Sequence, residues 1–124
     1  MLVVLYKEED ETCPVLQWLD DQSASGQERC EERLTRLSIL GHEIRRPAGA
    51  PLRDGIYELR VREEKVRLRM LFFFHGRDKA VVVHGFKKKT AEVPSREIDV
   101  AIEKKKRYEA DPEAHTLYWE PKHE

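Results

Sequence analysis

The sequence predicts an α+β domain of two layers, in which an N-terminal helical hairpin packs on a mostly antiparallel β-sheet and a C-terminal helix follows. Apolar residues recur at helical spacing in residues 12–40. Residues 57–70 then alternate between apolar and polar side chains, residues 80–83 form a continuous apolar run, and short polar turns separate the runs. Helical spacing returns after Pro94. Helices on one side of an antiparallel sheet form such a two-layer domain.

The first half of the chain is expected to hold one strand and two helices. The apolar run Leu2–Tyr6 predicts a strand. Helices are expected over about residues 12–21 and 25–40, with a break between them and Gly41 as the terminator of the second. Residues 42–54 contain two prolines and a glycine without periodicity, which indicates a loop.

The second half is expected to hold three strands and one helix. The strands are predicted over residues 55–61, 65–74 and 79–86, and the third is expected to be central because residues 80–83 are continuously apolar. The last helix is expected to begin at Pro94 and Ser95, with Ser95 as its N-cap, and to end by Asp111. At 124 residues the chain is one domain, with a core over about 1–110 and a tail, 111–124, that matches no structural class.

Charge is distributed unevenly along the chain. Lysine and arginine number 23 and aspartate and glutamate 24, for a net charge of −1. Residues 1–32 nevertheless hold nine acids and two bases, whereas residues 33–124 hold 21 bases and 15 acids. This asymmetry favours a nucleic-acid surface on one side of the molecule and an acidic flank elsewhere. The alternative is a soluble protein whose charge is merely uneven.

The remaining composition indicates a cytoplasmic protein without a metal or cofactor. Cys13 and Cys30 are the only cysteines, and without a secretory pattern they are expected to be reduced and buried. No run approaches the ~18 apolar residues of a membrane span. The five histidines are scattered without the spacing of metal ligands.

A row of cations on the first two strands of the predicted hairpin is the most informative feature. It comprises Arg60, Arg62, Lys65, Arg67 and Arg69. Side chains in a strand alternate faces, so these residues share one face while apolar residues take the other. A turn about residues 63–64 would place Arg60 opposite Arg67 and Glu58 opposite Arg69. Facing like charges weaken a sheet, so the cations are expected to serve a polyanion.

Three stretches resemble one family. They are Leu-Arg-Asp-Gly-Ile-Tyr-Glu-Leu-Arg at 52–60, Arg-Met-Leu-Phe-Phe at 69–73, and His-Gly-Phe-Lys-Lys-Lys-Thr at 84–90, with Pro94, Glu97-Ile98 and Ala101 after it. In this order and spacing they resemble the phage-derived Gp49-like, or HigB, group of the RelE/ParE toxin superfamily. The resemblance extends strongly over about residues 50–108 and in layout only over the helical hairpin.

The resemblance implies a toxin of a type II toxin–antitoxin pair that cuts mRNA on the ribosome without metal or cofactor. It also implies a helix-turn-helix antitoxin as partner, and we expect a monomer when the toxin is free. The residues it assigns to catalysis are Arg60, Arg69, Lys88 and Lys89. Those expected to bind RNA are Arg62, Lys65, Arg67, Phe86 and Lys87. Arg69 is expected to contact the scissile phosphate.

Two other functions fit the same sequence pattern. A ParE-like inhibitor of DNA gyrase would share the fold, and so would a non-catalytic RNA-binding member. Leu68 stands where many members have an aromatic residue, which weakens the case for base stacking there. Glu58 and His84 are the nearest candidates for acid–base chemistry, although Glu58 is better interpreted as an ion-pair partner of Arg69, and His84 as a sheet histidine.

Overall fold

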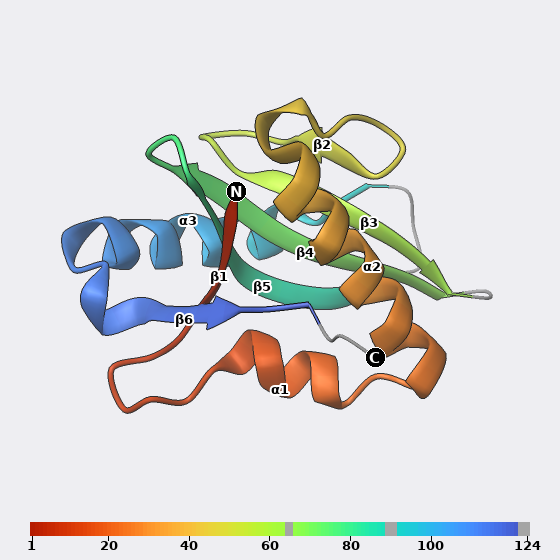
Figure 1. Cartoon of the computed structure of the whole chain (residues 1–124), viewed down its shortest axis with the longest axis horizontal. Helices are drawn as coiled ribbons and strands as arrows, with labels where there is room; N and C mark the ends of the chain where they lie inside the picture. Colours follow the sequence, from red (N-terminus) through yellow and green to blue (C-terminus); the bar gives the residue numbers. More distant parts are fainter. Residues whose placement is uncertain (64–65, 89–91, 122–124) are drawn as a thin grey trace.

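The computed structural model describes residues 1–63, 66–88 and 92–121. Six strands form one sheet in the order β2-β3-β4-β5-β1-β6 (Figure 1). The strands are β1 (Leu2–Tyr6), β2 (Gly49–Pro51), β3 (Tyr57–Glu63), β4 (Val66–His75), β5 (Lys79–Lys88) and β6 (Thr116–Trp119). Within this part of the chain, β1 runs parallel to β5 and the other neighbouring pairs are antiparallel. The expected α+β class and the central place of the third predicted strand are confirmed.

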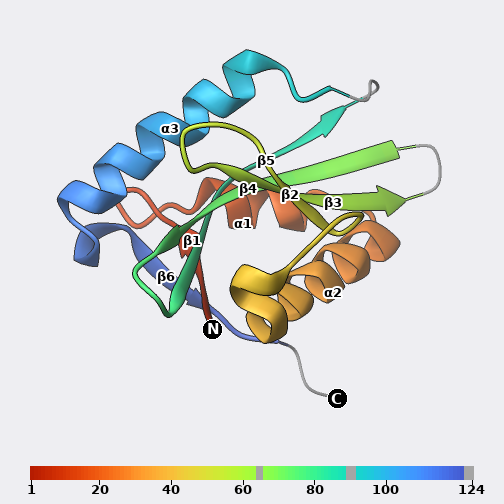
Figure 2. The same cartoon turned by 90° about the horizontal axis from the view of Figure 1, so that it is seen from above.

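Helices lie on both faces of the sheet. The helices α1 (Pro14–Asp20) and α2 (Ala24–Leu40) cover one face, and α3 (Ser95–Ala110) crosses the other (Figure 2). Each face accordingly has its own apolar cluster: Leu34, Leu59 and Met70 belong to the first, and Phe73 and Ile98 to the second. The sequence led us to expect all helices on one side, but β4 and β5 carry apolar residues on both faces and therefore need cover on both.

Local signals place the helix ends. The Ser23 hydroxyl accepts a hydrogen bond from the Gly26 backbone N–H at 3.0 Å and begins α2. Gly41 ends α2 with φ of 54°, a conformation that favours glycine. Ser95 is the first residue of α3 rather than its N-cap, which is Pro94. Its hydroxyl instead accepts a hydrogen bond from Arg53 at 3.0 Å, so it ties the loop before β3 to α3.

The structure explains why the middle residue of the His-Gly-Phe stretch, Gly85, is a glycine. A Cβ atom at this position would lie 2.4 Å from the Trp18 ring, which packs directly on the backbone of β5. Only glycine leaves room for that ring, so Gly85 fixes α1 against the sheet. The flanking residues His84 and Phe86 point to the opposite face, towards α3.

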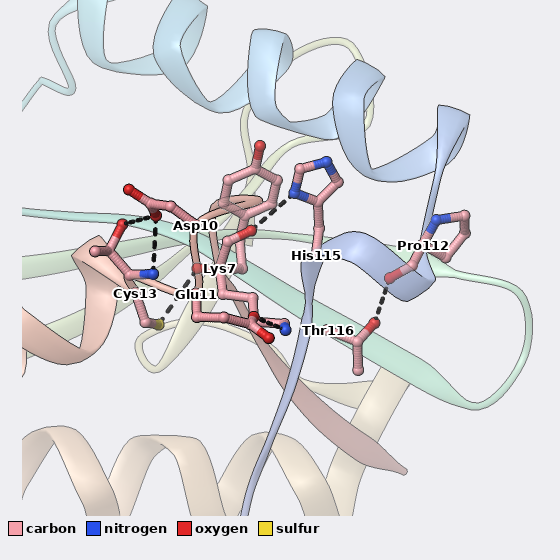
Figure 3. Close-up of polar contacts among 9 residues, drawn as sticks. Lys7, Asp10, Glu11, Cys13, Pro112, His115 and Thr116 are labelled. Carbon is pink, nitrogen blue, oxygen red and sulfur yellow. Dashed lines mark hydrogen bonds and ion pairs between the residues drawn. The ribbon is translucent and has the colours of Figure 1, made fainter.

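The tail, to which the sequence assigned no structure, forms the edge strand β6. The His115 ring stacks on Tyr6 at 4.7 Å between centroids, and its Nδ1–H donates to the Lys7 carbonyl at 2.8 Å (Figure 3). The Thr116 hydroxyl donates to the Pro112 carbonyl at 2.7 Å. Buried and paired in this way, His115 holds the tail on β1. The loop expected over 42–54 likewise contains the short edge strand β2.

Both cysteines are buried and free, as expected. Burial raises the pKa of the Cys30 thiol to about 12, so this thiol is protonated at neutral pH. No helix in the described ranges is long and apolar enough to cross a membrane.

Candidate nucleic-acid interface

The hairpin of β3 and β4 brings the predicted arginines face to face. Arg60 pairs with Arg69 and Arg62 with Arg67, whereas the expected register placed Arg60 opposite Arg67 and Glu58 opposite Arg69. That expected register is wrong by two residues, because β3 continues to Glu63, which pairs with Val66. A shift of two preserves the face of every side chain, so the shared basic face remains.

Three rows of side chains cross β3, β4 and β5 on the face that α3 partly covers. In chain order the rows are Glu58–Leu71–His84, Arg60–Arg69–Phe86 and Arg62–Arg67–Lys88. We call these nine residues the basic face. It holds five cations and one carboxylate, so it carries a surplus of positive charge. Opposed like charges disfavour a sheet by several tenths of a kcal/mol per pair, and this fold tolerates three such pairs: Arg60–Arg69, Arg62–Arg67 and Arg67–Lys88.

Glu58 lies beneath two of the arginines. Its side chain is 2% exposed, and its Oε1 accepts a hydrogen bond from Arg60 Nε at 2.6 Å. Its Oε2 lies 3.3 Å from Arg69 Nε, an ion pair without hydrogen-bond geometry. The Arg69 side chain is only 9% exposed, whereas that of Arg60 is 31% exposed. The interpretation of Glu58 as the ion-pair partner of Arg69 is therefore confirmed, and Arg60 is the more accessible of the two cations.

Burial lowers the pKa of two cations of the basic face, Arg69 and Lys88. Desolvation lowers the pKa of the Arg69 guanidinium, although an arginine stays protonated at neutral pH. Desolvation and the nearby charge of Arg69 lower the pKa of Lys88, which is itself 6% exposed. The basic face is thus a crowded cationic site, with Glu58 its one carboxylate.

The other predicted site residues divide into three groups. Arg62 is exposed and Arg67 is half-buried, at the end of the face nearest the β3–β4 turn. Lys87 aligns with Val61 and Leu68 and therefore points to the opposite face of the sheet. Lys65 and Lys89 lie outside the described residues.

At the α3 end of the basic face, a histidine and a glutamate form a pair that the sequence did not indicate. His84 Nε2 lies 2.5 Å from Glu97 Oε2, and the His84 ring stacks on Phe86 at 5.6 Å. Glu97 comes from the first turn of α3, 13 residues further along the chain. Only the packing of α3 across the sheet brings it there, so no local pattern in the sequence could have revealed the pair.

No group of three or more histidine, cysteine, aspartate or glutamate side chains in the described part of the chain could hold a metal ion. The basic face can bind an anion electrostatically through its guanidinium groups and the Lys88 ammonium group, and an imidazole–carboxylate pair lies beside them.

A family model described as "Phage derived protein Gp49-like" matches residues 17–106, a span from α1 into α3 that contains the whole basic face. No curated protein matches the chain.

Proposed function

The chain belongs to the phage-derived Gp49-like family, and on this premise we propose that it is the toxin of a type II toxin–antitoxin pair, acting as a ribosome-dependent mRNA endonuclease. The observation that carries the proposal is the surplus of cations on the basic face. Five positive side chains and one carboxylate share three adjoining strands, and two arginine pairs directly oppose each other. A surface of this kind favours a polyanionic ligand such as RNA.

The proposed chemistry needs no group beyond the chain and its substrate. The 2′-OH of the RNA attacks the adjacent phosphorus, and negative charge develops on the phosphoryl oxygens. Arg60, which is more exposed than Arg69, contacts these oxygens, because a guanidinium binds phosphate through a planar fork and stays charged. Arg69 adds positive potential from beneath. Fixed cations at such a position contribute several kcal/mol to the transition state.

The remaining residues have supporting roles in this proposal. Arg62 and Arg67 bind the flanking phosphates, and Lys88, with Lys89 beside it in sequence, orients the RNA. Phe86 packs against His84 and so supports the face rather than a base. The partner is a helix-turn-helix antitoxin encoded nearby, and the toxin acts in the cytoplasm as a monomer on translating ribosomes.

One observation favours a second candidate function. Arg69, expected to contact the scissile phosphate, is almost fully buried against Glu58. A family member in which that arginine no longer reaches RNA would bind RNA without cutting it. The two candidates differ in product: a nuclease leaves new RNA ends, whereas a binding protein leaves the message intact.

Induced expression followed by primer extension on cellular mRNA tests the proposal. We expect growth arrest and new 5′ ends within translated codons. Replacing Arg60 with alanine should lower the cleavage rate by about 10²–10³-fold, the usual cost of losing one oxyanion-stabilising group. Arg60 is the better position for this test because Arg69→Ala would also leave Glu58 with a single partner.

Arg77→Ala provides the matched control, since Arg77 is exposed in the β4–β5 turn, at the far end of the sheet. This variant should cut as the unmodified protein does. If the protein binds ribosomes but leaves the mRNA intact, the result would favour the RNA-binding candidate. A DNA-damage response without new RNA ends would favour gyrase inhibition, and either result would overturn the nuclease.

A further inference from the structure

The basic face ends at the one imidazole–carboxylate pair that adjoins it. We propose that His84 is the general base of the cleavage reaction and that Glu97 is its positioning residue. This inference rests on the proposed nuclease function and adds to it the group that takes the proton of the 2′-OH. The cations of the face can stabilise the phosphate, but none of the arginines can accept a proton at neutral pH.

The position of His84 suits this task. It lies one row from Arg69 along the sheet and one strand away, and rows and strands are about 6.8 Å and 4.8 Å apart. A nucleotide whose phosphate contacts Arg60 and lies over Arg69 therefore has its ribose within reach of His84. The His84 ring packs on Phe86, and its side chain is 22% exposed, so it is accessible to a ligand.

Glu97 prepares the ring for this role. The 2.5 Å contact engages Nε2, so the carboxylate fixes the ring and its tautomer and leaves Nδ1 as the nitrogen that faces away from Glu97. When Nδ1 accepts a proton, the carboxylate stabilises the resulting imidazolium, as the acid of a serine-protease triad does. Glu97 is 19% exposed, so little solvent screens the pair.

Charged groups approach the pair from each neighbouring element. Arg96 of α3 lies 3.7 Å from Glu97 Oε1, and Lys104, further along α3, donates to the Val83 carbonyl at 3.1 Å. Glu58 lies in the same row of the sheet, with Leu71 between it and His84.

The proposed step balances as follows. His84 Nδ1 takes the proton of the 2′-OH while the 2′-oxygen forms a bond to phosphorus. The bond from phosphorus to the 5′-oxygen breaks, and that oxygen takes a proton from water. The products are a 2′,3′-cyclic phosphate and a 5′-OH end, and His84 then returns its proton to the solvent. No oxidant, reductant or metal takes part.

Single-turnover cleavage of a defined mRNA on translating ribosomes tests the assignment with the full chain. His84→Ala should cut about 10²–10⁴-fold more slowly, the usual contribution of a general base. The rate of the unmodified protein should fall on the acid side of about pH 5–8, where imidazoles become charged, and the variant should lose this limb. Added imidazole should restore cleavage by His84→Ala, because it can occupy the space of the missing ring.

Three further variants separate catalysis from structure. Glu97→Gln should lose less activity than Glu97→Ala, because the amide oxygen can still accept the Nε2–H but no longer balances the imidazolium. Imidazole should not restore Arg60→Ala. His75→Ala, which removes a histidine at the far end of β4, should retain activity and the acid limb.

Each outcome bears on one claim. If the unmodified protein cuts but His84→Ala cuts equally fast, or keeps the acid limb, the assignment of His84 is overturned and the nuclease stands. If His84→Ala is slow, folded by its melting curve and insensitive to imidazole, His84 has a structural role and the assignment is also overturned. If the unmodified protein leaves mRNA intact, the nuclease itself is overturned and the assignment with it.

Discussion

The two faces of the β3–β4 hairpin have the same backbone and opposite chemistry. On the face towards α2, Leu59 and Val61 pair with Met70 and Leu68, and all four side chains are at most 1% exposed. On the other face, the same two strands present arginines at the alternate positions. One face is committed to folding. The other carries a surplus of positive charge, and this difference is the physical basis for assigning it a ligand.

The edges of the hairpin support the same distinction. Beyond β2, the outer edge of β3 is covered by two arginines of α2: Arg33 Nε donates to the Arg60 carbonyl at 2.8 Å and Arg29 to the Arg62 carbonyl at 3.0 Å. These side chains satisfy an edge that could otherwise pair with another strand. The two α2 arginines therefore bind backbone carbonyl groups, whereas the arginines of the basic face leave a surplus of positive charge that a ligand can bind.

The largest expected effect comes from truncating the α2 face. Leu68→Ala should lower the free energy of unfolding by about 2–5 kcal/mol, because it opens a cavity in a packed core. Its neighbour Arg67 faces the other way, and Arg67→Ala should change that free energy by only about 0.5 kcal/mol in either direction. Urea unfolding of the two variants measures the difference. A cost for Arg67→Ala equal to that of Leu68→Ala would show that the basic face also holds the fold together.

Much of the fold could be predicted because its signals are local. Period-two alternation identified β3 and β4, a continuous apolar run identified β5, and Gly41 marked the end of α2. What could not be predicted depends on contacts between distant segments. Nothing in Thr116–Trp119 reveals that it pairs with β1, and nothing in α3 reveals which face of the sheet it covers. Both are decided by which apolar surface remains uncovered after the hairpin has folded.

The candidate site was predictable to the same extent. The alternation of side chains along each strand was enough to place Arg60, Arg67 and Arg69 on one face. This prediction holds although the register was wrong, because a shift of two residues leaves every side chain on the same face. Burial was not predictable: Arg69 matched the motif, yet the structure leaves Arg60 the more accessible cation. The pairing of Glu97 with His84 was also missed, since it needs the path of α3.

Glu58→Gln sharpens the comparison at an intermediate scale. The substitution keeps the shape but removes the buried carboxylate between Arg60 and Arg69, so it should lower the free energy of unfolding by about 1–3 kcal/mol, as for a hydrogen bond to a charged group. Sulfate should recover part of the loss, because an anion that binds only the folded protein stabilises it. Thermal unfolding with sulfate and with chloride at equal ionic strength measures both effects.

A second substitution provides the control. Adding Arg69→Met to Glu58→Gln removes the buried cation along with its partner, so the double variant should be more stable than Glu58→Gln alone. The sulfate effect should also shrink, since one of its ligands is gone. If Glu58→Gln were as stable as the unmodified protein, the cations of the face would not depend on Glu58, and the crowding argued for the basic face would be wrong.

The smallest expected effect concerns two exposed cations at the same end of the sheet. Arg62 belongs to the basic face, whereas Lys87 points to the α2 face. If RNA lies on the basic face, Arg62→Ala should reduce the slope of log affinity against log salt by about 0.7, the value for one phosphate contact to a single strand. Lys87→Ala should leave the slope unchanged although it removes the same charge. Binding of a single-stranded RNA titrated with potassium chloride measures both slopes. Equal reductions would mean that RNA responds to the net charge of the molecule and not to one face, because only a ligand held against the arginine side of β3 and β4 can distinguish the two cations.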